Sequence, residues 1–155
     1  MFALLDGNNF YASCERAFRP DLNARPVVIL SNNDGCAIAR SEEAKALGIK
    51  MGAPYFQIQA LEQSAGLIAL SANFALYGDM SDRMMSLAER LGHRQEVYSI
   101  DECFIDLSGM PGDLTLRARK IRGRIGRWLG LPTCVGIGPT KTLAKLANHI
   151  AKSAE

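Results

Sequence analysis

The sequence predicts an α+β fold, a ferredoxin-like split βαβ domain that carries a small α/β insert. Apolar stretches typical of strands alternate with helical periodicities in the order β-α-β-β-α-β, once residues 11–71 are set aside as the insert. The 155 residues are 48% hydrophobic, which is enough to bury a core. No run of 18 apolar residues occurs, so we expect neither a membrane span nor a membrane partner.

The N-terminal segment is expected to form a strand, a turn and a helix. Residues 2–6 are apolar up to Asp6, a Gly-Asn-Asn turn follows, and residues 10–18 have helical spacing. Asp6 therefore lies at the carboxyl end of a predicted strand. Taken alone, it is suited to capping the helix that follows.

Turn and breaker residues divide the rest of the chain into alternating elements. Asn73 is expected to cap a long amphipathic helix, and Gly92 to end it. The remaining predicted elements are a hairpin of strands 26–30 and 36–39, a helix at 41–47, a short helix from Pro54 to near Gly66, an apolar run at 67–70, a hairpin within 97–108, a helix at 114–129, a strand at 133–137 and a helix at 141–152.

The second hairpin carries an acidic pair, Asp101-Glu102, between two apolar runs. On its own such a pair is more typical of a polar turn than of a binding site. The alternative is a metal platform, because neighbouring carboxylates can bridge two hard cations. In the split βαβ topology the strand of Asp6 can lie beside this hairpin. A third carboxylate at the same sheet edge favours the metal site.

Charge is unevenly distributed along the chain. Residues 1–113 hold 9 Lys+Arg against 15 Asp+Glu, whereas residues 114–155 hold 9 against 1. The helix at 114–129 carries six of these cations and no acid. It is either a nucleic-acid stripe or, as is more usual for a basic helix, a solvated outer face.

Other familiar sites are excluded by spacing. Gly136-Ile137-Gly138 lacks the third glycine of a dinucleotide fingerprint, and no glycine precedes Lys141-Thr142 as a phosphate loop requires. We expect these glycines to serve a strand-to-helix turn. Four widely spaced cysteines without a C-x-x-C pattern favour neither a disulfide scaffold nor a zinc site, and are consistent with the cytoplasm.

Several motifs in order resemble the Y-family translesion DNA polymerases, and within them the UmuC-like branch, the catalytic subunits of DNA polymerase V. They extend over the whole chain. The motifs are Asp6 with residues 9–13, residues 18–22, residues 31–36, residues 44–48, residues 99–102, and residues 135–137 with 141–147.

The resemblance implies a catalytic centre in a palm domain. Asp6, Asp101 and Glu102 would bind two Mg²⁺ ions, for which Mn²⁺ can substitute, with the Gly7 carbonyl as a further donor. Residues 1–10 and 72–155 would form the palm, and residues 11–71 the fingers. The thumb and little-finger domains of the family have no counterpart within these residues.

The resemblance also implies residues that bind the incoming nucleotide. Tyr11 would be a steric gate against a 2′-hydroxyl, supported by Phe10, for which core packing is the alternative. Lys45 and Lys145 would reach the triphosphate, and Ile38 would cover the nascent base pair. The fingers depart from the family pattern, since Glu42 and Lys45 stand where much of the family has Tyr and Arg.

The implied function is template-directed, error-prone DNA synthesis past damaged bases, in the SOS response and at the nucleoid. Expected partners are primer–template DNA and a deoxynucleoside triphosphate, together with a UmuD-type dimer, the sliding clamp and a recombinase filament for the full-length protein. Alternatives are a non-catalytic damage-response module or truncated relic, and a nucleotidyl cyclase on the same palm topology. The nucleotidyl cyclase would leave the tyrosine gate and the insert unexplained.

Overall fold

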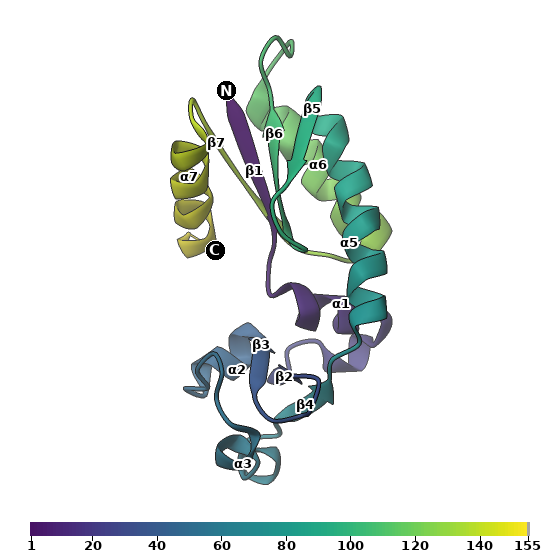
Figure 1. Cartoon of the computed structure of the whole chain (residues 1–155), viewed down its shortest axis with the longest axis vertical. Coiled ribbons are helices and arrows are strands. Elements are labelled where there is room, and N and C mark those ends of the chain that lie inside the picture. The colour runs from purple at the N-terminus through teal and green to yellow at the C-terminus, as the bar shows by residue number, and fades with distance from the viewer. Residues whose placement is uncertain (155) are drawn as a thin grey trace. The chain divides into compact units, whose positions relative to one another are not determined.

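The computed structural model describes residues 1–154 and divides into two compact units (Figure 1). The first unit comprises Met1–Asn8 and the chain from Gly78 onward, and the second comprises Asn9–Tyr77. No helix within residues 1–154 is long and apolar enough to cross a membrane.

The first unit is built on a four-stranded antiparallel sheet in the order β5-β6-β1-β7. Its strands are β1 (Phe2–Gly7), β5 (Arg94–Val97), β6 (Glu102–Asp106) and β7 (Thr133–Gly138). Its helices are α5 (Phe74–Ala88), which starts in the second unit, the short 3-10 helix η2 (Glu89–Leu91), α6 (Leu114–Leu129) and α7 (Lys141–Ser153). This is the predicted split βαβ order with a closing helix, and the fold class is confirmed.

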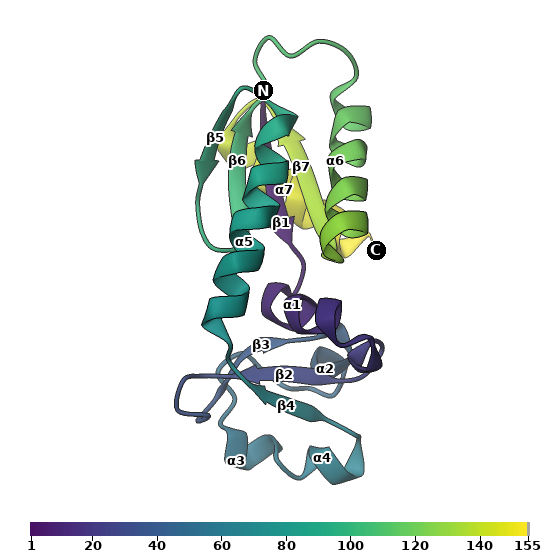
Figure 2. The same cartoon turned by 90° about the vertical axis from the view of Figure 1, so that its right-hand side faces the viewer.

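The helices cover opposite faces of this sheet. Helices α5 and α6 lie on one face and α7 on the other (Figure 2). Leu4 of β1 and Phe104 of β6 pack with Ala144 of α7. Because every second residue of a strand points to the same face, Asp6 and Glu102 share the α7 face with them.

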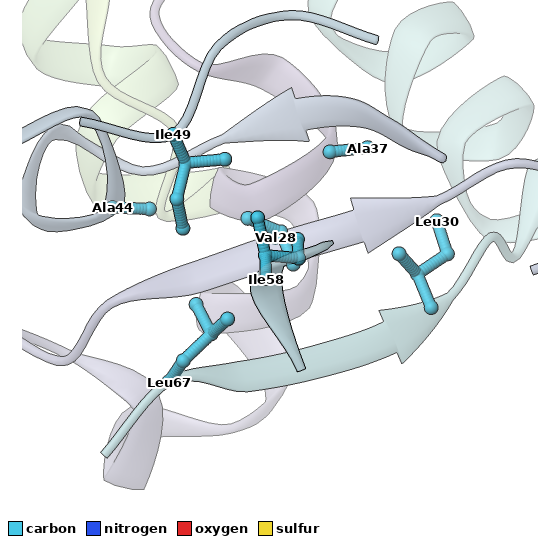
Figure 3. Packing of buried hydrophobic residues seen from close by; sticks show 7 residues of the cluster. All are labelled: Val28, Leu30, Ala37, Ala44, Ile49, Ile58 and Leu67. Carbon is cyan, nitrogen blue, oxygen red and sulfur yellow. The ribbon is translucent and has the colours of Figure 1, made fainter. Parts of the chain in front are cut away.

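The second unit contains a three-stranded sheet in the order β3-β2-β4, with β3 antiparallel and β4 parallel to β2. The strands are β2 (Val27–Leu30), β3 (Ala37–Arg40) and β4 (Ile68–Ser71). The helices are α1 (Phe10–Phe18), the 3-10 helix η1 (Pro20–Leu22), α2 (Glu42–Ala46), α3 (Tyr55–Ile58) and α4 (Leu61–Ser64). Figure 3 shows the buried residues that join these elements, among them Val28, Ile49 and Ile58.

Two predicted elements differ from the structure. The helix expected from Pro54 to near Gly66 is two single turns, α3 and α4. The first strand of the acidic hairpin is β5 at Arg94–Val97, earlier and more polar than the apolar run at 97–100. Edge strands with one solvated side tolerate such polar residues, so hydropathy alone misplaces them.

Candidate active site

Two predicted site residues face each other across neighbouring strands. In the antiparallel register of β1 and β6, Asp6 is the direct partner of Glu102. The backbone N–H of Gly7 donates to the carbonyl of Asp101 at 2.8 Å, which holds the third acidic residue at the same strand end. The topology therefore gathers residues separated by nearly 100 positions, as the split βαβ prediction requires.

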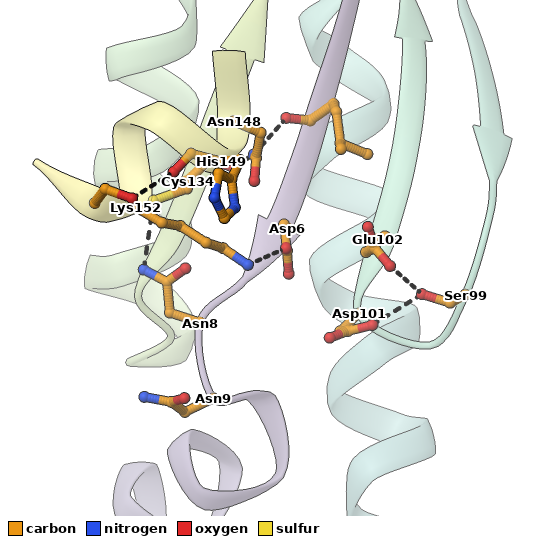
Figure 4. A network of polar contacts seen from close by, with 12 residues as sticks. Asp6, Asn8, Asn9, Ser99, Asp101, Glu102, Cys134, Asn148, His149 and Lys152 are labelled. Carbon is orange, nitrogen blue, oxygen red and sulfur yellow. Dashed lines mark hydrogen bonds and ion pairs between the residues drawn. The ribbon is translucent and has the colours of Figure 1, made fainter. Parts of the chain in front are cut away.

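Ser99 anchors the acidic pair within the bend that precedes β6. Its hydroxyl donates to Asp101 Oδ1 at 2.8 Å and lies 3.3 Å from Glu102 Oε1 (Figure 4). Its backbone N–H donates to the carbonyl of Glu102 at 3.2 Å. The bend thus presents both carboxylates from a constrained loop rather than from a freely moving turn.

Asp6 carries an unfavourably placed negative charge. Burial raises the pKa of this carboxyl to about 6, against the lowering effect of a hydrogen bond and ion pair with Lys152, while the charges of Asp101 and Glu102 raise it further. Figure 4 shows the Lys152 ammonium reaching Asp6 from α7. The helix-cap alternative for Asp6 is wrong, because its carboxylate contacts α7 and Asn9 is the N-cap residue of α1.

Lys152 is the residue that the sequence reasoning missed. Burial would lower the pKa of its ammonium, but the hydrogen bond and charge of Asp6 outweigh burial and raise that pKa. A signal was present in the sequence, since polar residues recur along α7 at i, i+4, i+7 and i+11. These residues are Lys141, Lys145, Asn148 and Lys152.

The other members of this stripe contact the sheet or its neighbouring bend. Lys141 pairs with Glu96 of β5, and Lys145 Nζ lies 5.4 Å from the ring centroid of Tyr98. Asn148 is buried, and its amide donates to the carbonyls of Leu4 and Cys134 at 3.1 Å each. The predicted phosphate ligand Lys145 therefore lies over Tyr98, whereas the ammonium at Asp6 is that of Lys152.

Glycine brings α7 close to β7. A Cβ atom on Gly136 would stand 2.2 Å from the backbone nitrogen of Asn148, and one on Gly138 would stand 2.7 Å from that of Ala144. The expectation that both glycines serve a turn is wrong for Gly136, which lies within β7. It is required because the helix backbone touches the strand at that point.

The donor set at this sheet edge fits a hard divalent cation. Asp6, Asp101 and Glu102 offer carboxylate oxygens, the ligands that Mg²⁺ and Mn²⁺ prefer. A cation would offset the burial of the Asp6 charge, the main cause of its raised pKa, and the smaller repulsion from Asp101 and Glu102. Residues 1–154 contain no group of three or more His, Cys, Asp or Glu side chains already arranged to hold a metal.

In the second unit, Tyr11 belongs to an aromatic cluster. Its ring stacks on Tyr77 with centroids 4.4 Å apart and 15° between planes, and meets Phe74 edge-on at 6.0 Å. Phe10 is only 4% exposed, so its ring is a core element, the alternative considered for it. Ile38 is half-buried on β3.

Lys45 is held in a polar trio within the same unit. Its ammonium donates to Asn9 Oδ1 at 2.8 Å and to Glu42 Oε1 at 3.1 Å. Hydrogen bonds from Asn9 and Lys45 lower the pKa of the Glu42 carboxyl. The ammonium of Lys45 is therefore engaged in an exposed ion pair, with which a phosphate would have to compete.

Comparison with known proteins identifies the family. The model of the impB/mucB/samB family matches residues 5–149, which include both the Asp6 strand end and the acidic pair. The chain belongs to the impB/mucB/samB family.

The relatives of this impB/mucB/samB chain include named polymerases. It is 55% identical over 154 residues to protein UmuC of Salmonella typhimurium, 48% to protein MucB of Escherichia coli, and 35% to DNA polymerase IV of Corynebacterium diphtheriae. The matches cover 98%, 99% and 96% of this chain, but only 36%, 37% and 34% of those proteins. The chain thus spans about a third of the length of its curated relatives.

Solved structures show the same fold. DinB from Sulfolobus solfataricus superposes with a TM-score of 0.85 at 28% identity, covering 97% of this chain and 46% of that one. An insertion ternary complex of Dbh DNA polymerase gives a TM-score of 0.86 at 28% identity, covering 100% and 46%. The resemblance to Y-family polymerases of the UmuC-like branch is therefore confirmed.

Proposed function

We propose that this chain is the catalytic portion of an error-prone DNA polymerase that copies damaged template strands. The observation that carries the proposal is the pairing of Asp6 with Glu102 on one sheet face, beside Asp101 and under the ammonium of Lys152. Primer–template DNA and a deoxynucleoside triphosphate are the proposed substrates. In this assignment the first unit corresponds to the palm and the second to the fingers, near the predicted boundaries of 1–10 with 72–155 and 11–71.

Asp6, Asp101 and Glu102 would hold the two proposed Mg²⁺ ions, with the Gly7 carbonyl as a further donor. When bound, these ions supply activation of the attacking hydroxyl and charge stabilisation at the leaving phosphate. The chain's own contribution is to fix the carboxylates at strand ends and to desolvate Asp6.

We propose that Lys152 exchanges partners when the metal ions and the nucleotide bind. In the structure its ammonium neutralises Asp6. A divalent ion at the carboxylates would take over that role, and Lys152 would then be available to the phosphates of the nucleotide. Lys145 and Lys45 remain proposed phosphate ligands, and Tyr11 with Phe10 and Ile38 a proposed sugar and base contact.

Metal binding tests the assignment without relying on turnover. We expect Mn²⁺, followed by electron paramagnetic resonance, to bind the chain and to be lost in Asp6→Asn and Glu102→Gln. Glu89→Gln removes an exposed acid on η2 and serves as the matched control. Equal Mn²⁺ binding by wild type and Asp6→Asn would contradict the proposed ligand set.

Lys152→Met separates the two roles of the lysine. Removing the competing ammonium should tighten Mn²⁺ binding severalfold, while binding of the triphosphate should weaken. A change in the same direction for both ligands would contradict the exchange of partners.

The chain itself is expected to extend primers poorly, because DNA affinity rests largely on phosphate contacts and the relatives are about three times longer. Processive synthesis in a low-salt primer-extension assay would contradict this expectation. Binding of a UmuD-type dimer, the sliding clamp or a recombinase filament at the nucleoid is proposed for the longer protein only.

A further inference from the structure

Helix α6 presents cations that the first unit does not use. Arg117 Nε donates to the carbonyl of Leu91 at 3.1 Å, and Arg122 Nε donates to that of Thr133 at 2.8 Å, so both hold the helix in place. The other four cations of the helix are exposed and have no acidic partner within residues 1–154. They are Arg119, Lys120, Arg124 and Arg127.

These cations line up with the only tryptophan in the chain. Lys120, Arg124 and Trp128 follow one another at i, i+4 and i+8, which places them along one flank of the helix. Trp128 is 58% exposed, an unusual position for the largest apolar side chain. A row of cations ending in an exposed aromatic ring is the combination that binds single-stranded nucleic acid, through phosphate contacts and base stacking.

The ring of Trp128 borders an open groove of about 430 Å³ between α5 and α6. Leu87, Arg90 and Leu129 line it together with the charged residues Asp79, Asp82 and Arg83 of α5. The acids and arginines of the lining balance, and Arg83 pairs with Asp79, so the groove holds no excess positive charge to draw a phosphate away from α6. A base can enter it and stack on Trp128 while the phosphates stay along α6.

Two glycines of α6 lie among its cations, so no side chain covers the helix backbone there. Gly123 and Gly126 face the outside of the helix, and a Cβ atom on either would meet nothing within 4 Å. The fold of the first unit therefore does not require glycine at these positions. Because Gly123 and Gly126 have no side chains, a sugar–phosphate chain can approach the helix backbone at these positions.

We propose that the outer face of α6, defined by Arg119, Lys120, Arg124, Arg127 and Trp128, is a second nucleic-acid site that binds a single strand. The site is separate from the carboxylates. Asp6 and Glu102 lie on the α7 face of the sheet, whereas α6 covers the opposite face (Figure 2). A strand bound here is therefore a different segment from one whose end is being extended.

The test uses the full chain with oligo(dT) of about 20 nucleotides, in buffer with EDTA so that no divalent ion is present. Binding is followed by quenching of Trp128, because no other tryptophan contributes to the emission. We expect saturable quenching that weakens with salt, with log–log slope of about −0.7 for each phosphate neutralised.

The triple variant Arg119→Gln/Arg124→Gln/Arg127→Gln should bind about tenfold more weakly at low salt and lose about 2 from the magnitude of the salt slope. The matched control is Arg19→Gln/Arg25→Gln/Lys50→Gln, which removes three exposed cations outside α6 and outside the groove, and should bind as wild type. Trp128→Leu, followed with a labelled oligonucleotide, should weaken binding severalfold.

The outcomes separate this site from the carboxylate centre, since no variant touches Asp6, Asp101 or Glu102. Equal binding by wild type and the α6 triple variant would overturn the proposal. So would saturation without quenching of Trp128. Quenching by polyglutamate with no response to oligo(dT) would also overturn it, in favour of an acidic protein partner.

Discussion

Helices α6 and α7 are both basic, yet they make opposite use of their charge and of glycine. The lysines of α7 contact groups of the first unit, namely Glu96, the ring of Tyr98, and Asp6. The exposed cations of α6 have no such partner within residues 1–154. A glycine of β7 lets α7 touch the sheet, whereas the outward glycines of α6 touch nothing. The role of a basic helix therefore cannot be inferred from its net charge alone. It depends on which groups its cations contact.

The largest effect should come from obstructing the close backbone contact between β7 and α7. Gly136→Ala places a Cβ atom 2.2 Å from the backbone of Asn148, which no side-chain rotation can relieve. We expect a loss of about 3 kcal/mol in the free energy of unfolding, since overpacking against backbone is among the most costly substitutions. Urea denaturation measures it. A loss below about 0.5 kcal/mol would show that α7 is not held by this contact.

The sequence predicted the elements that bring β1 and β6 together, and hence the approach of Asp6 to Glu102. It did so because apolar periodicity and turn residues are local signals, and the split βαβ order then fixes strand neighbours. The contact of Lys152 with Asp6 joins positions 146 apart, and depends on how closely α7 docks. That distance is set by Gly136, whose role as a contact surface is not visible in a strand pattern.

Contacts between distant parts of the chain also determine the features of the acidic hairpin and of the insert that the sequence did not predict. Strand β5 is an edge strand of polar sequence, stabilised by its register with β6 rather than by its own propensity. The aromatic cluster of Tyr11 could not be predicted either, because its partner Tyr77 lies on another helix. A tyrosine that acts as a steric gate and one that packs in a core are the same residue type, so only the contacts of the ring distinguish the two roles.

The second prediction concerns the buried amide that fastens α7 to the strands. Asn148→Ala removes the donor shared by the carbonyls of Leu4 and Cys134, both within the sheet. We expect a loss of about 2 kcal/mol, the cost of leaving buried polar groups without their partner. Thermal and urea unfolding measure it. Exposed His149→Ala on the same helix is the control and should change stability by less than about 0.5 kcal/mol.

The third prediction concerns the charge of the Asp6 carboxylate, which pairs with Lys152 of α7. Because the pKa of Asp6 is raised in the folded chain, its ionised form costs stability. That cost is absent at low pH, grows as pH rises from about 4 to about 6, and is complete above it. In EDTA, Asp6→Asn should therefore be more stable than wild type by about 1–3 kcal/mol at pH 7, with little difference at pH 3.5. Urea titrations at both pH values measure the gap.

A stabilising effect of Asp6→Asn that is equal at both pH values would contradict burial of the charge as its cause. The exposed Asp21→Asn is the control, and should leave the pH dependence of wild type unchanged. The result also bears on function, since residues that bind metal commonly sacrifice stability in the free protein.

The smallest effect tests the open face of α6. Gly123→Ala and Gly126→Ala add a methyl group where nothing lies within 4 Å, in the middle of a helix where glycine is unfavourable. Each should raise the free energy of unfolding by about 0.5–1 kcal/mol, opposite in sign to Gly136→Ala. Urea denaturation of the three variants side by side gives the comparison. If the α6 variants destabilise the chain instead, that face is packed against the protein and is not available to a nucleic acid.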